Sequence, residues 1–136
     1  MASFTKFNPF VENVAEKVFN LGTDTLKVAL TNSAPVATNG TLSQITEISY
    51  TNLSSRTITI SASSQTSGTY KLTLADLVLT SSGGTTGAFR YVVVYDDTAT
   101  NDELIGYYDY GSSITLQDGD TFTIDFDATN GFLTIA

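Results

Sequence analysis

The sequence predicts a mainly β fold, an antiparallel β-sandwich of about seven to nine short strands with one N-terminal α-helix packed on it. Short runs of alternating apolar and polar residues recur from residue 24 to residue 135. Turn signals separate these runs, of which Asp118-Gly119 and Asn130-Gly131 are the clearest. One longer stretch near the N-terminus has helical periodicity instead. The short connections between the later strands favour antiparallel pairing.

The length of 136 residues predicts one domain, because a chain of this size buries an ordinary core without metals or disulfides. We divide it into an arm over residues 1–7, a helix over 8–21 and the sandwich over 24–136. The arm carries Phe4 and Phe7 among polar residues. It either frays or docks on a neighbouring molecule.

Residues 8–21 (NPFVENVAEKVFNL) predict the helix. Asn8 is a suitable N-cap, Pro9 suits the first helical position, and Gly22 is a stop signal. Apolar residues fall on one side at helical spacing: Phe10, Val11, Val14, Val18 and Leu21. This stripe either packs on the sheet or forms a contact between subunits.

Alternating patterns predict the strands. In chain order they cover residues 24–31, 57–63, 69–80, 88–97, 103–111, 113–116, 121–126 and 132–135. The apolar parity within 69–80 shifts across Ala75-Asp76, which predicts a bulge or a strand break there. The strand 88–97 is apolar on both faces, so it is central and covered on both sides, or it is covered by another subunit.

A long irregular stretch, residues 32–56, interrupts the strands. Within it, residues 42–48 (LSQITEI) carry apolar side chains at the spacing of about one helical turn. A connection of this length in a compact domain is either functional or a surface excursion that its short helix pins down.

Composition excludes several kinds of site. The chain has no cysteine and no histidine, so it lacks thiolate nucleophiles, the commonest general base and the commonest transition-metal ligand. The net charge of −8 and the six scattered Lys and Arg residues argue against binding to nucleic acid or to an anionic membrane. The N-terminus lacks the layout of a signal peptide, and no run reaches the roughly 18 apolar residues of a membrane helix. We therefore expect a soluble protein made in the cytoplasm.

Carboxylates are the only candidates for chemistry. The acidic run DDTATNDE (residues 96–103) lacks the spacing of a calcium loop, so it is interpreted as a solvated loop, with a weak calcium site as the alternative. Paired acids that could hydrolyse a glycoside occur by chance in most acidic domains, and the chain has no Trp to line a sugar cleft. We predict that the protein is not an enzyme, with no catalytic, cofactor-binding or metal-binding residue and no cofactor.

Five tyrosines cluster in the predicted strands 88–97 and 103–111: Tyr91, Tyr95, Tyr107, Tyr108 and Tyr110. Tyr is favoured at protein interfaces, but it also forms cross-strand pairs on half-exposed sheets. Tyr108 and Tyr110 share one strand face, and they are the two that we expect at an interface.

The run FRYVVVYDDTATNDELIGYYDYGSSITLQDGDTFTIDF, with the final NGFLTI, resembles small virion proteins of tailed bacteriophages. The earlier segments KVALTNSAP, TLSQITEI and LTLADLVLT fit the same pattern, so the resemblance extends from about residue 26 onward. Relatives often carry a glycine-rich G-Y-T-x-G-G stretch after the short helical segment. Here residues 49–56 (SYTNLSSR) keep Tyr50 and Thr51 without the glycines.

The resemblance implies a non-enzymatic structural module of the virion. The first hypothesis is a capsid cement or decoration protein that binds the major capsid protein, bridges its subunits and self-associates, with a trimer favoured. The second is a tail or fibre module that binds a host-surface receptor or glycan. The third is a small carbohydrate-active enzyme.

Partner contacts are expected in the arm and in residues 32–56, since both are polar and poor in local anchors, and at the two tyrosines. The candidate contact residues are Phe4, Phe7, Pro35, Val36, Tyr50, Arg56, Tyr108 and Tyr110. On this hypothesis, deletion of residues 1–7 weakens attachment without unfolding the domain.

Overall fold

The predicted fold class is confirmed. A computed structural model describes residues 2–136, with 47% of residues in strands and 8% in helices. The described residues form one α-helix, one short 3-10 helix and ten strands. The elements are β1 (Phe4–Lys6), α1 (Asn8–Ala15), β2 (Leu26–Thr31), η1 (Leu42–Gln44), β3 (Thr57–Ile58), β4 (Ile60–Thr66), β5 (Thr69–Leu74), β6 (Leu77–Thr80), β7 (Thr86–Asp96), β8 (Leu104–Leu116), β9 (Thr121–Ile124) and β10 (Leu133–Ile135).

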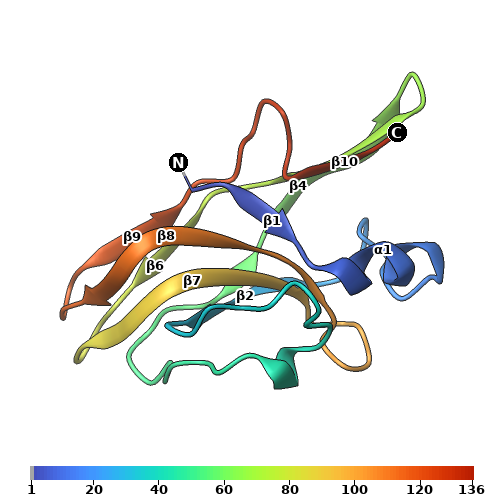
Figure 1. The fold of residues 1–136 in the computed structure, drawn as a ribbon. Helices are drawn as coiled ribbons and strands as arrows, with labels where there is room; N and C mark the ends of the chain where they lie inside the picture. Colours follow the sequence, from blue (N-terminus) through green and yellow to red (C-terminus); the bar gives the residue numbers. More distant parts are fainter. Residues whose placement is uncertain (1) are drawn as a thin grey trace.

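The strands form two layers. A five-stranded sheet has the order β1-β8-β7-β2-β3, and two smaller sheets have the orders β10-β5-β4 and β6-β9. Every pairing between these strands is antiparallel. The smaller sheets lie opposite the large one (Figure 1). Between the layers, Leu72, Leu79 and Ile124 from the small sheets pack in one buried cluster with Val28 and Val94 from the large sheet.

The outer face of the five-stranded sheet is covered by the chain itself. Val93 and Tyr95 on β7 belong to a second buried cluster with Phe7 and with Ile45 of the 32–56 segment. Val94, which lies between them in sequence, faces the main core. β7 is therefore a central strand with both faces buried, and residues of the same chain supply both covers.

The helix is shorter than the sequence predicts. α1 ends at Ala15 rather than at Leu21, and its N-cap is Phe7 rather than Asn8. Lys17 adopts a left-handed conformation (φ 66°), and the Val18 N–H donates to the Asn13 carbonyl at 2.9 Å. This is the geometry of a Schellman motif, which ends a helix and usually has glycine at the left-handed position. Because Lys17 takes that position here, the nearest glycine, Gly22, was wrongly predicted as the end of the helix. The chain beyond it still buries Leu21 in the core, whereas Val11 is 56% exposed.

Four of the predicted strands are divided or joined differently. Residues 57–66 form β3 and β4, which belong to different sheets, and the 69–80 run breaks into β5 and β6. The break falls at Ala75-Asp76, where the parity shift predicted it, and Asp76 Oδ1 accepts from the Phe126 N–H at 2.9 Å. Conversely, residues 104–116 form a single long strand, β8, in place of the two shorter ones.

The 32–56 segment is pinned at several points along the large sheet. Its 3-10 helix η1 carries a capping box between Thr41 and Gln44. Thr41 forms a β-bridge to Glu103, and the Ile48 N–H donates to the Leu30 carbonyl at 3.0 Å. The segment thus covers the free edge of β2 beyond the short strand β3. Neither helix in the described residues is long and apolar enough to cross a membrane.

Candidate functional site

The N-terminal arm is part of the sheet, contrary to the expectation of a loose or docking arm. β1 pairs with β8 through Phe4–Tyr108, Thr5–Tyr107 and Lys6–Gly106. Phe7 has 0% exposure, and its ring centroid lies 5.3 Å from that of Tyr107. A side chain at Gly106 would collide with the Phe4 ring, so glycine there permits the close approach of β1. Phe7 is therefore not available to a partner in this structure.

Tyr50 and Arg56 are also turned inward. The Tyr50 Oη accepts from the Leu30 N–H at 3.0 Å and donates to Glu47 Oε1 at 2.7 Å. Arg56 stacks on the Tyr50 ring at 3.8 Å, and its Nη1 donates to the Val28 carbonyl at 2.8 Å. Burial, helped by the hydrogen bond to Glu47, raises the pKa of Tyr50 well above its usual value. Both side chains form hydrogen bonds to backbone groups at the edge of β2. The sequence pattern did not predict this role.

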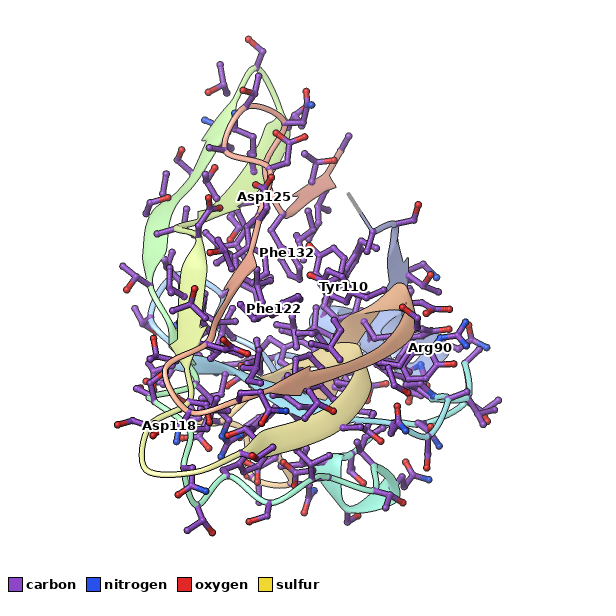
Figure 2. The ribbon with its side chains drawn as sticks, turned by 90° about the vertical axis from the view of Figure 1, so that its left-hand side faces the viewer. Arg90, Tyr110, Asp118, Phe122, Asp125 and Phe132 are labelled. Atoms are coloured by element: carbon purple, nitrogen blue, oxygen red, sulfur yellow. The ribbon has the colours of Figure 1, made fainter. Side chains whose placement is uncertain are left out.

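Tyr108 and Tyr110 close one side of the sandwich. We call this row of rings the aromatic seam: Phe4, Tyr108, Tyr110, Phe122, Phe126 and Phe132. In it Tyr110 meets Phe122 edge-on at 5.0 Å, and Phe4 meets Phe132 at 4.6 Å. Figure 2 shows Tyr110, Phe122 and Phe132 between the two layers. Tyr108 is buried, with 5% exposure, whereas Tyr110 is half-buried, and burial raises the pKa of Tyr110 to about 12. Tyr108 therefore packs against neighbouring strands and is not an exposed interface residue. Only part of Tyr110 reaches the surface.

Pro35 and Val36 lie in an exposed turn. Val36 is 57% exposed, and Pro35 is half-buried. Asn39 Oδ1 accepts from the Val36 N–H at 2.8 Å, and the Ala37 carbonyl accepts from the Asn8 N–H at 2.8 Å. The turn is therefore held in one shape while Val36 points outward, which suits a small contact.

A more extensive exposed surface was missed by the sequence reasoning. The facing parts of β4 and β5 and the turn between them, residues 61–71, form what we call the outer hairpin, which extends away from the rest of the molecule together with β10 (Figure 1). Its side chains are exposed on both faces apart from Ser63 and Tyr70, whose hydroxyls lie 2.8 Å apart. The signal was composition: SASSQTSGT (61–69) has no apolar residue larger than alanine, so it has no face to bury.

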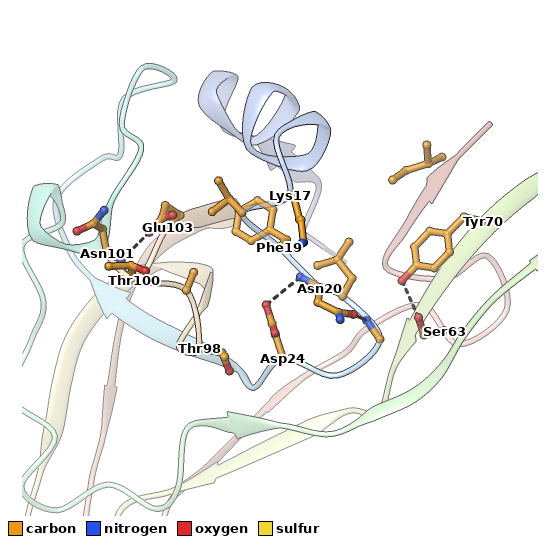
Figure 3. A pocket seen from close by; sticks show the side chains of 15 residues that line it. Lys17, Phe19, Asn20, Asp24, Ser63, Tyr70, Thr98, Thr100, Asn101 and Glu103 are labelled. Atoms are coloured by element: carbon orange, nitrogen blue, oxygen red, sulfur yellow. Dashed lines mark hydrogen bonds between the residues drawn. The ribbon is translucent and has the colours of Figure 1, made fainter.

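An open cleft of about 990 Å³ lies at the base of this hairpin (Figure 3). Three segments line it: the link between α1 and β2, the outer hairpin with β10, and the loop between β7 and β8. Its polar side chains include Lys17, Asn20, Asp24, Tyr70, Asn101 and Glu103. Phe19 and Leu21 supply an apolar part of the lining.

The acidic run 96–103 binds its own backbone. Asp96 has 0% exposure, and its Oδ1 accepts from the Thr98 and Ala99 N–H groups at 2.9 and 3.1 Å. Glu103 is buried, and its Oε1 accepts from the Asn101 N–H at 2.6 Å. The interpretation as a solvated loop therefore fails for these two acids, though it fits the exposed Asp97, which pairs with Lys27 at 3.4 Å. Across residues 2–136, no group of three or more acidic side chains is arranged to hold a metal ion.

Comparisons of the chain with protein-family models, with curated proteins and with solved structures each give no match. A functional proposal therefore depends on the exposed surfaces, which are the outer hairpin and the turn at Val36. It also depends on the resemblance of the strand and turn motifs to small virion proteins of tailed phages.

Proposed function

We propose that this chain is a non-enzymatic structural protein of a tailed-phage virion: a capsid cement protein that binds the outer shell and bridges neighbouring subunits of the major capsid protein. The resemblance from about residue 26 onward supports the virion role. The observation that carries the binding role is the outer hairpin, where residues 64–69 are exposed on both faces of the strand pair.

A strand pair without a covering layer is marginally stable in water, and a partner surface that covers one face stabilises it. The outer hairpin is already anchored at its base, where Leu72 and Leu74 of β5 enter the core. Its polar tip does not promote aggregation of the free protein, because it presents no apolar edge. These properties suit a module that folds alone and binds afterwards.

In this proposal, the exposed turn at Pro35 and Val36 forms a second contact with the capsid. Self-association as a trimer then links further capsid subunits. The net charge of −8 favours a basic patch on the capsid subunit. Attachment driven by such a charge difference weakens as salt rises, because salt screens exposed charges beyond about 10 Å.

The test is co-sedimentation of the purified protein with capsid shells that lack it. Ser64→Arg, at an exposed hairpin position, is expected to weaken binding at least about tenfold, which corresponds to about 1.4 kcal/mol. Thr123→Arg makes the same change of charge at an exposed position of β9, outside the hairpin, and is the matched control. Equal binding of both variants would contradict the role of the hairpin, and failure of the wild type to bind shells would contradict the cement role.

A tail or fibre module predicts a different result in the same experiment. The wild type would then sediment with tails or with host cells, and not with shells. The hairpin variant would compete poorly for adsorption.

A further inference from the structure

The core-facing side of β7 ends in a buried carboxylate, Asp96. In the register of β2 and β7, Leu26 lies opposite Asp96, and Val28 lies opposite Val94. Leu26, Val28 and Val94 all belong to the main core. Because side chains alternate along a strand, Asp96 continues the buried face of Val94. Asp24 precedes β2, two residues before Leu26.

Asp96 has one oxygen without a conventional partner. The Oδ1 atom accepts two backbone N–H groups of the following loop, whereas Oδ2 is fully buried and no donor reaches it. The Asp97 N–H donates to the Thr25 carbonyl at 2.8 Å, so the end of β7 lies beside the residues that precede β2. Asp24 is the carboxylate in that segment that raises the pKa of Asp96. Asp24 in turn accepts from the Asn20 N–H at 2.9 Å through its Oδ2 and lines the cleft (Figure 3). Asp96 is fully buried, and a second carboxylate beside it increases the cost of charging it.

We propose that Asp96 and Asp24 share one proton. The resulting hydrogen bond helps to hold the loop 97–103 against the turn 20–25 at the edge of the cleft. The proton sits on Asp96 Oδ2, and the hydroxyl so formed donates to the Asp24 carboxylate. Loss of this proton leaves two facing negative charges, which weakens the attachment of the loop to the turn.

The charges nearby do not offer another partner. On β2, Lys27 pairs with Asp97 at 3.4 Å, and on the β8 side Glu103 accepts from Asn101. Lys17 lines the cleft from the link after α1. Burial, followed by the hydrogen bond and the charge of Asp24, raises the pKa of Asp96 to about 7, and the Ala99 and Thr98 N–H groups oppose this rise. A calcium ion fits less well, because it takes about six to eight oxygens and two carboxylates supply few of them.

The pH dependence follows from the direction of the shift. The folded chain holds a proton between about pH 4 and about pH 7 that the unfolded chain has lost. Stability from the pair is therefore complete below about pH 4, and it is lost as pH rises to about 7. This contribution is opposite in sign to that of an ordinary paired carboxylate.

The decisive variant is Asp96→Asn. The amide oxygen keeps the two backbone hydrogen bonds, and the amide NH₂ group replaces the shared proton with a permanent donor to Asp24. Asp97→Asn removes the same charge one residue away and is the matched control. Asp24→Asn serves as an independent second variant.

The measurements are side-chain carboxyl ¹³C titration by NMR and urea midpoints across this pH range. In the wild type and in Asp97→Asn, one carboxyl should titrate near neutrality and the midpoint should fall with pH. Asp96→Asn should lose that titration, and the fall in midpoint should shrink. Asp24→Asn should move the titration to lower pH, because it removes the neighbouring carboxylate while Asp96 stays buried. The proposal is overturned if no carboxyl of the wild type titrates above about pH 5. It is also overturned if millimolar Ca²⁺ at higher pH raises the midpoint of the wild type but not that of Asp96→Asn, since a cation then occupies the pair.

Discussion

Single polar side chains complete the sheet where a strand is missing. β3 pairs with β2 only at Leu26 and Lys27, so the backbone groups of β2 farther along need other partners. The Tyr50 hydroxyl takes the Leu30 N–H, and the Arg56 guanidinium takes the Val28 carbonyl. These two side chains therefore have structural roles, and residue type alone did not distinguish such roles from partner contacts.

At this scale we predict that Tyr50→Phe destabilises the fold by about 1–3 kcal/mol, because it leaves the Leu30 N–H without its acceptor. Tyr70→Phe removes a hydroxyl whose partner, within residues 2–136, is Ser63 on the outer hairpin, and it should cost less than about 1 kcal/mol. Urea unfolding of both variants checks the difference. Equal losses would mean that the Tyr50 hydroxyl does not support β2.

At the scale of elements, β1 and the residues around it close the large sheet. Phe7 follows β1 and fills the second buried cluster beside Val93 and Tyr95. Deletion of residues 1–7 therefore removes a core side chain and a strand together. Such a deletion destabilises the fold, so it does not test attachment separately from folding.

The point substitution Phe7→Ala should lower the free energy of unfolding by about 3–5 kcal/mol through loss of buried contacts. Val11→Ala, at an exposed position of α1, should change it by no more than about 0.5 kcal/mol. Thermal or urea unfolding distinguishes the two. A small effect at Phe7 would indicate that β1 detaches easily and that the arm is available to a partner after all.

Elements were predictable where a local rule was followed. The alternation in 121–126 and the turn at Asp118-Gly119 located β9, and the parity shift located the break at Ala75-Asp76. The early end of α1 was not predictable, because it depends on a left-handed Lys17 where glycine is usual. The division of residues 57–66 between two sheets was also hidden, since both halves alternate in the same way.

At the scale of the whole molecule, long-range contacts decide what is surface. The burial of Asp96, Phe7 and Tyr108 depends on strands far away in the sequence, so these residues could not be assigned from local patterns. The apolar outer face of β7 predicted a cover, but only the structure shows that the 32–56 segment and Phe7 provide it. The exposed features that bear on partner binding include the outer hairpin, the turn at Val36 and the open cleft.

We propose that this protein binds to the capsid in many copies per particle. The most direct measurement is the copy number of the chain in purified virions, determined by quantitative gel or mass spectrometry against the major capsid protein. We predict a copy number that scales with the capsid subunits, and particles without the chain should have shells that are less resistant to heat and to low salt. A handful of copies per particle, or none, would contradict the claim.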